Sequence, residues 1–126
     1  MTKFSIKIDT LWIAPLMLIG ASRDQSYVEI GDSELHIKMG IGDERIPLTN
    51  IELVEPHEWS LFHGIGHRVT HDGLGYVGST DHVVRIKLKA PQSFHVIFGM
   101  HKEFSNFYVS LEHPQEFQAA LLERLG

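Results

Sequence analysis

The chain has 126 residues, of which 43% are hydrophobic and 21% charged, with no cysteine and a formal net charge of −5 when its nine histidines are neutral. The composition is that of a globular protein, and the length fits one domain over residues 1–126. The absence of cysteine excludes disulfides, thiolate chemistry and cysteine-based zinc sites, and we expect a cytoplasmic protein. The acidic balance is opposite to the basic field of nucleic-acid-binding proteins, so we expect no nucleic-acid partner.

Apolar and polar residues alternate over residues 3–9, a pattern typical of a half-buried strand. The apolar run that follows, residues 11–21, is shorter than the ~20 residues that span a bilayer and contains Pro15. One interpretation of this run is a secretion signal, because Lys3 and Lys7 precede it and small residues follow it. The alternation before it favours the other interpretation, a buried strand that bends at Pro15.

Period-two alternation continues through the middle of the chain. Two alternating runs flank a Gly-Asp-Ser turn at residues 31–33 and predict a β-hairpin. Pro47 has no N–H to donate, which places its strand at a sheet edge or at a strand end. The strands predicted in this part are 27–30, 34–39, 45–48 and 51–55.

The second half of the chain carries further alternating runs and then changes period. The inward-facing sets predicted for its strands are Val84, Ile86 and Leu88, then Phe94, Val96 and Phe98, then Phe107, Val109 and Leu111. Pro114 suits the first position of a helix, where an N–H would have no partner. After it, one helix face is formed at i, i+3, i+4 and i+8 by Phe117, Ala120, Leu121 and Leu125.

Several short strands followed by one amphipathic helix predict a mainly β (α+β) domain. We expect a curled antiparallel sheet or an open barrel of about seven strands, closed by the C-terminal helix. The apolar face of that helix needs a partner, and the inside of the curled sheet is the one available.

This order of elements resembles the pleckstrin-homology-like (PH-like) architecture, and the chain is similar to small bacterial PH-like proteins of uncharacterised function. The resemblance covers residues 26–125 and is carried by segments 26–30 (SYVEI), 34–40 (ELHIKMG), 46–51 (IPLTNI), 64–68 (GIGHR) and 109–117 (VSLEHPQEF). It implies a PH-like barrel and no established activity, catalytic residue or cofactor. Two segments lie outside its pattern: residues 57–80 are long for a turn of that fold, and residues 10–21 have no place in its strand count.

Residues 73–78 match the G-x-G-x-x-G pattern of dinucleotide-binding loops. That use requires a helix after the glycines, so that its N-terminus meets the pyrophosphate. Here a strand around residues 84–88 follows instead. We therefore predict turn glycines in a hairpin and no nucleotide cofactor.

His63, His67 and His71 recur at every fourth residue, a spacing that could hold zinc on a helix. Gly64 and Gly66 favour an extended chain instead, in which His67 and His71 would stand ~13 Å apart. We expect exposed or pocket-edge histidines and no metal site from this spacing. A site assembled from histidines distant in sequence stays open.

A basic stripe on one strand face is formed by Arg85, Lys87 and Lys89. In a PH-like module such a stripe could meet an acidic lipid surface or peptide. The favoured interpretation is a solvated strand face whose lysines protect an edge from aggregation. Membrane-surface binding is therefore the less favoured partner.

Residues 57–79 combine aromatic residues, histidines, one arginine and several glycines, as binding loops often do. The candidate binding residues are Trp59, His63, His67, Arg68, His71 and Tyr76. Arg68 could hold a carboxylate or phosphate through two parallel hydrogen bonds. The alternative is a long twisted hairpin whose aromatic residues belong to the core.

No nucleophile elbow or distinctive pair of carboxylates occurs, so we predict a non-enzymatic protein without catalytic residues or cofactors. The favoured function is a binding or oligomerisation module that contacts a protein or a second copy of itself through open strand edges. We accordingly expect a homo-oligomer. The alternative is a small-molecule or metal-binding protein, with hydrolysis among its activities, that uses the histidine-rich residues 57–80.

Overall fold

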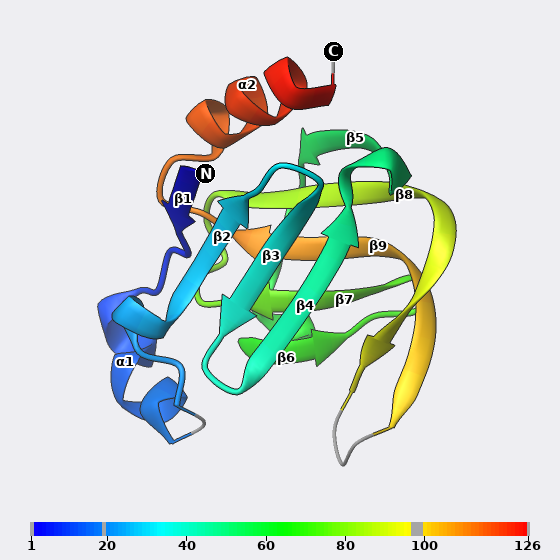
Figure 1. The fold of residues 1–126 in the computed structure, drawn as a ribbon. Helices are drawn as coiled ribbons and strands as arrows, with labels where there is room; N and C mark the ends of the chain where they lie inside the picture. The colour runs from blue at the N-terminus through cyan, green and yellow to red at the C-terminus, as the bar shows by residue number, and fades with distance from the viewer. Residues whose placement is uncertain (1, 19, 97–99, 126) are drawn as a thin grey trace.

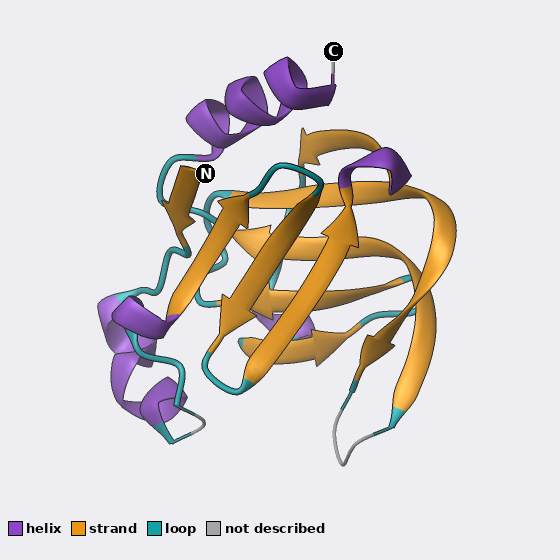
Figure 2. Ribbon diagram, viewed as in Figure 1, coloured by secondary structure: helices purple, strands orange, loops and turns teal. Residues whose placement is uncertain are grey.

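The computed structural model describes residues 2–18, 20–96 and 100–125. This part of the chain contains nine strands, two α-helices and three short 3-10 helices, which confirms a mainly β domain with a C-terminal helix (Figure 2). Phe98, one of the residues predicted to face inward, lies outside the described residues. Among the helices in those residues, none combines the length and the apolarity that crossing a bilayer requires.

The first sheet is an antiparallel meander of four strands in chain order. Its strands are β1 (Thr2–Ser5), β2 (Ser26–Ile30), β3 (Glu34–Met39) and β4 (Gly42–Pro47). The predicted hairpin is present, with Val28 opposite Ile37. Both side chains are fully buried, because every second residue of these strands faces the second sheet.

The second sheet has five strands in the order β5-β8-β9-β7-β6. They are β5 (Ile51–Pro56), β6 (Gly66–Val69), β7 (Gly73–Val77), β8 (Val83–His95) and β9 (His101–Ser110). Neighbours are antiparallel except β7 and β9, which run parallel. With β6 and β7, the structure has more strands than the expected count of about seven.

Strand β8 links the two sheets by curving from one to the other (Figure 1). Its first half pairs with β5 and β9, and its register then shifts between Lys87 and Gln92. At its far end the Gln92 side chain donates to the Arg45 carbonyl at 2.6 Å. The curled sheet expected from the sequence is thus formed by two facing sheets that β8 joins.

Helix α2 (Pro114–Leu125) closes one end of the core, as predicted. Phe117 and Leu121 are buried, and the Phe117 ring packs edge-on against Phe4 with centroids 5.4 Å apart. The Gln118 side chain donates to the Val54 carbonyl of β5 at 3.0 Å. The helix therefore bridges β1 and β5, strands of different sheets (Figure 1).

The expected strand in residues 11–21 is wrong, because Thr10–Met17 form helix α1. The run has no period-two alternation, and its leucine, alanine and methionine residues favour helix. Pro15 could not donate within a central strand. Only Leu16 of this helix is buried, while Leu11 is 77% exposed.

Gly73 and Gly75 lie in strand β7, and Gly78 follows it in a bridge to Ile8, so the expectation of turn glycines is also wrong. A Cβ on Gly73 would stand 2.6 Å from the Asn106 carbonyl oxygen, and one on Gly78 would stand 2.6 Å from the Lys7 carbonyl oxygen. The glycines are needed because neighbouring backbones approach closely. Strand β8 follows them, so the context of a dinucleotide site is missing.

Candidate functional site

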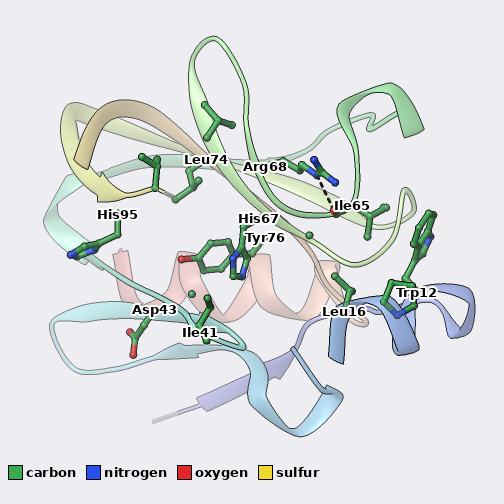
Figure 3. A pocket seen from close by; sticks show the side chains of 15 residues that line it. Trp12, Leu16, Ile41, Asp43, Ile65, His67, Arg68, Leu74, Tyr76 and His95 are labelled. Carbon is green, nitrogen blue, oxygen red and sulfur yellow. Dashed lines mark hydrogen bonds between the residues drawn. The ribbon is translucent and has the colours of Figure 1, made fainter. Parts of the chain in front are cut away.

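A cleft of about 1010 Å³ opens between the two sheets (Figure 3). Helix α1, the β3–β4 turn, the β6–β7 hairpin and the end of β8 each contribute to its wall. These segments are distant in sequence and meet only in the folded chain (Figure 1). The volume is at the upper end of the range for small-molecule sites, roughly 300–1,000 Å³.

The centre of the cleft is formed by His67 and Tyr76, which face each other across β6 and β7 with ring centroids 4.7 Å apart. His67 Nε2 lies 2.7 Å from the Met39 carbonyl oxygen. Since a carbonyl only accepts, Nε2 carries the proton and Nδ1 is the acceptor nitrogen of the neutral ring. A hydrogen bond thus ties β6 to the end of β3.

Gly42 at the β3–β4 turn makes this contact possible. A Cβ at Gly42 would stand 2.7 Å from Tyr76 Cζ and 2.8 Å from His67 Nε2, closer than real contacts allow. The two ring side chains therefore lie directly against the backbone of the turn (Figure 3). The glycine brings the edges of the two sheets together at this point.

Burial keeps both central side chains uncharged. It lowers the pKa of His67, an effect that the hydrogen bond to Met39 only partly offsets. Burial also raises the pKa of Tyr76 well above its usual range, and the nearby carboxylates of Glu44 and Asp43 add to this. At neutral pH the centre of the cleft therefore offers neutral hydrogen-bonding groups.

The charged groups that line the cleft differ in whether they have a partner. Asp43 Oδ1 lies 2.7 Å from Nε2 of His36 on β3. His95 Nδ1 lies 3.0 Å from Oε1 of the buried Glu44, whose pKa burial raises. Arg68 makes no salt bridge within the described ranges, and its Nε donates to the Ile65 carbonyl at 2.8 Å.

The rest of the wall is apolar. Leu16 and Trp12 of α1 face Ile65 at one end of the cleft (Figure 3). Ile41 and Val69 are 79% and 50% exposed, so apolar surface continues from the wall to the solvent. None of the described residues in the wall is a serine, threonine, cysteine or lysine. The wall thus combines apolar side chains with a few polar ones, as small-molecule sites do.

Three of the six candidate binding residues line this cleft, namely His67, Arg68 and Tyr76. Trp59 does not, because it is 5% exposed, and its indole N–H donates to the Gly64 carbonyl at 2.9 Å. The ring of His63 packs beside it, with centroids 5.0 Å apart. His71 projects into solvent with 92% of its side chain exposed. The structure thus divides the predicted set into cleft and non-cleft residues.

The basic stripe on β8 is largely neutralised by its neighbour β5. Arg85 forms a salt bridge with Glu55, and Lys87 Nζ lies 3.1 Å from Glu52 Oε2. Lys89 is exposed. This arrangement is that of a solvated strand face, and it leaves less positive charge for an acidic surface than the sequence suggests.

A metal site would need several ligands in one place. In the part of the chain that the structure describes, histidines and carboxylates form no group of three or more that could hold an ion. His67 donates to Met39 and His95 contacts Glu44, so the two histidines of the cleft already have protein partners.

Sequence reasoning missed the cleft residues Trp12, Leu16, Ile41 and His95, which belong to three other segments. For Ile41 a local signal existed, since it is a large apolar residue in a glycine-flanked turn. The others carry no such signal, because their role depends on contacts far apart in the chain.

Comparisons with protein-family models, with curated proteins and with solved structures found no match to the chain.

Proposed function

We propose that this protein is a non-catalytic PH-like binding module that holds an apolar small molecule in the cleft between its sheets. The PH-like part of the proposal is supported by the order of elements. If the β6–β7 hairpin is set aside and β1, which lies before residue 26, is counted, seven strands precede the C-terminal helix, close to the number that the resemblance implies. The hairpin lies in residues 57–80 and α1 lies in residues 10–21, the two segments outside the PH-like pattern.

One observation carries the binding function: the two added segments build the cleft. Ten of the fifteen lining residues come from α1 and from residues 65–76. A ligand that enters a space of this size removes the apolar walls from water, which favours its binding. The two added segments together provide most of those walls.

The chemistry of the cleft supports binding over catalysis. His67 and Tyr76 are neutral, and His67 is already hydrogen-bonded to the protein. Such groups orient a ligand within an apolar wall, which is how small-molecule sites achieve specificity.

The proposal can be tested with a neutral apolar fluorophore, N-phenyl-1-naphthylamine. We expect a saturable rise in its fluorescence with one site per chain. Val69→Trp, at a half-exposed position of the mouth, should obstruct that site and lower the affinity about tenfold or more, the loss of roughly 1.4 kcal/mol.

A matched control places the same side chain elsewhere. Leu122 on α2 is 67% exposed and does not line the cleft, so Leu122→Trp should leave the affinity unchanged. Circular dichroism would verify that both variants fold. Equal affinities in the two variants, or a signal that never saturates, would overturn the proposal.

Self-association stays a prediction from the sequence. The strands β1 and β6 are at sheet edges and could pair with another chain. A light-scattering mass of 14.3 kDa at micromolar concentration would overturn the prediction of a homo-oligomer.

A further inference from the structure

Arg68 is held in a fixed orientation at the cleft. Its Nε donates to the Ile65 carbonyl at 2.8 Å. Its side chain also lies over Gly64, where a Cβ would stand 2.6 Å from Arg68 Nε and 2.9 Å from Cζ. Gly64 has a φ of +86°, which glycine adopts easily. The turn thus fixes the guanidinium, and the terminal N–H groups stay available for a ligand.

The charge balance of the cleft indicates the sign of that ligand. Asp43 pairs with His36, and His95 contacts Glu44. Of the charged lining groups in the described residues, Arg68 is the one that forms no salt bridge. Arg68 is exposed at the edge of the cleft, and a guanidinium without a salt-bridge partner there attracts an anion.

The negative charges in and near the cleft limit the anion to a single charge. Asp43 lies toward the other end of the cleft from Arg68 (Figure 3), Glu44 follows it in β4, and the chain as a whole carries −5. A second negative charge on the ligand would be repelled by both carboxylates. A carboxylate satisfies these conditions better than a phosphate monoester, which carries nearly two charges at neutral pH.

The shape of the cleft adds an apolar body to this head group. Trp12, Leu16 and Ile65 gather on the side of the cleft where Arg68 lies (Figure 3). A molecule bound to the guanidinium would therefore extend its apolar part directly along these side chains.

We propose that the ligand is a monocarboxylic acid with an apolar body, bound through its carboxylate by the terminal N–H groups of Arg68 and through its body by the wall that α1 and the β6–β7 hairpin form. This inference rests on the proposed function and names the class of molecule that the cleft takes. Two parallel N–H···O bonds from a guanidinium fit a carboxylate in geometry as well as in charge.

The test measures displacement of N-phenyl-1-naphthylamine by decanoate and by decan-1-ol, two probes of equal chain length that differ in the charged head. Both are used at neutral pH and below the concentration at which decanoate forms micelles. Decanoate should displace the fluorophore at about tenfold lower concentration, the effect of one charge-assisted contact of roughly 1.4 kcal/mol.

Variants assign this difference to one side chain. Arg68→Gln should remove the advantage of decanoate and leave displacement by decan-1-ol unchanged, whereas Arg68→Lys should keep part of it. Arg45→Gln is the matched control, because Arg45 is an exposed arginine outside the cleft that pairs with Glu34 at 2.9 Å. This control should bind both probes as the parent protein does.

The outcomes separate the two proposals. Equal displacement by the acid and the alcohol, or an unchanged advantage in Arg68→Gln, would overturn the carboxylate and leave the apolar site standing. Stronger displacement by decyl phosphate than by decanoate would also overturn it, in favour of a phosphate. If the fluorophore itself does not bind, the proposed function fails and this inference fails with it.

Discussion

Residues 57–80 contribute aromatic side chains to both faces of the same sheet. On the outer face, the ring of Trp59 lies 5.4 Å from that of Tyr108. On the inner face, Tyr76 meets Phe107 edge-on at 4.9 Å. One face is packed and the other borders the cleft. An aromatic residue among histidines and glycines is therefore no indication of binding until its face of the sheet is known.

The glycines of β7 explain how one strand serves both faces. Gly73 and Gly75 face outward, where a Cβ on Gly73 would stand 2.6 Å from the Tyr108 ring and one on Gly75 would stand 3.2 Å from the Trp59 ring. Leu74 and Tyr76 alternate with them and line the cleft. The outward positions are glycines because the rings of Trp59 and Tyr108 lie directly on the strand.

The largest effect on stability should come from removing the Trp59 side chain from the outer face. Trp59→Ala should lower the free energy of unfolding by about 3–5 kcal/mol, because it deletes a large buried ring and leaves a cavity. Urea denaturation measures this loss. Arg68→Gln, at an exposed position beside the cleft, should cost no more than about 0.5 kcal/mol. Similar losses of unfolding free energy in the two variants would contradict the assignment of Trp59 to the packed outer face and of Arg68 to the cleft.

The next effect concerns the contact between the turn and the centre of the cleft. Gly42→Ala places a methyl group within 2.7 Å of Tyr76 Cζ, so either the turn or the ring must move. We expect a loss of about 1–3 kcal/mol in unfolding free energy, as for overpacking elsewhere, together with weaker binding of the neutral fluorophore. Unchanged stability and affinity would show that Gly42 is not needed for this approach.

A pair of tyrosine substitutions compares the two faces directly. Tyr108 Oη donates to Asp72 at 2.9 Å on the outer face, and burial with the adjacent carboxylate raises the pKa of Tyr108 to about 12. Tyr108→Phe should lower stability by about 1–2 kcal/mol without changing fluorophore affinity. Tyr76→Phe should change that affinity. The opposite assignment, seen by urea denaturation and fluorescence titration, would reverse our interpretation of the two faces.

His67 on the inner face and Asp72 on the outer face should contribute to stability in different pH ranges. Burial lowers the pKa of His67, so the unfolded chain binds the proton more readily and stability falls as the pH drops below 6.5 toward the folded value. For Asp72, burial raises the pKa, but hydrogen bonds from Thr70 and Tyr108 lower it further, to a net decrease. Its contribution is present above 3.8 and is lost as the pH falls through the lower folded value.

Unfolding free energies of the parent protein, His67→Gln and Asp72→Asn, measured across this pH range, check these signs. The difference between the parent and His67→Gln should change below pH 6.5, the ordinary His value. The difference between the parent and Asp72→Asn should stay constant until the pH falls below 3.8. If both differences changed in the same pH range, the contributions of His67 and Asp72 to stability would not be independent.

The smallest effect on the unfolding free energy is expected for a substitution on β8, outside both the cleft and the outer-face cluster of Trp59 and Tyr108. Lys87 pairs with Glu52 at 3.1 Å, and both side chains are nearly half exposed. Lys87→Gln should change the unfolding free energy by no more than about 0.5 kcal/mol, because water screens such pairs. A loss above 1 kcal/mol would assign this stripe a structural importance that its exposure does not indicate.

Local patterns predicted much of the frame. Alternation placed Val28 and Ile37 inside the first sheet, and the spacing of Phe117 and Leu121 placed one face of α2 against the core. These predictions succeed because a strand repeats every two residues and a helix every 3.6, so a few neighbours define the apolar face. The same approach failed for residues 10–17, because a continuous apolar run has no period that distinguishes a helix from a strand.

The sequence by itself determined that aromatic, histidine and arginine side chains gather in residues 57–80, and it gave His67, Arg68 and Tyr76 as three of six candidate binding residues. The tertiary structure alone decided that these three line a cleft, that Trp59 covers the outer face of the sheet, and that Trp12 and His95 complete the wall. The parallel pairing of β7 with β9 and the curvature of β8 bring these segments together. A local sequence pattern shows which residues are apolar, but it does not show which distant segment covers them. Long-range pairings therefore cannot be predicted from it.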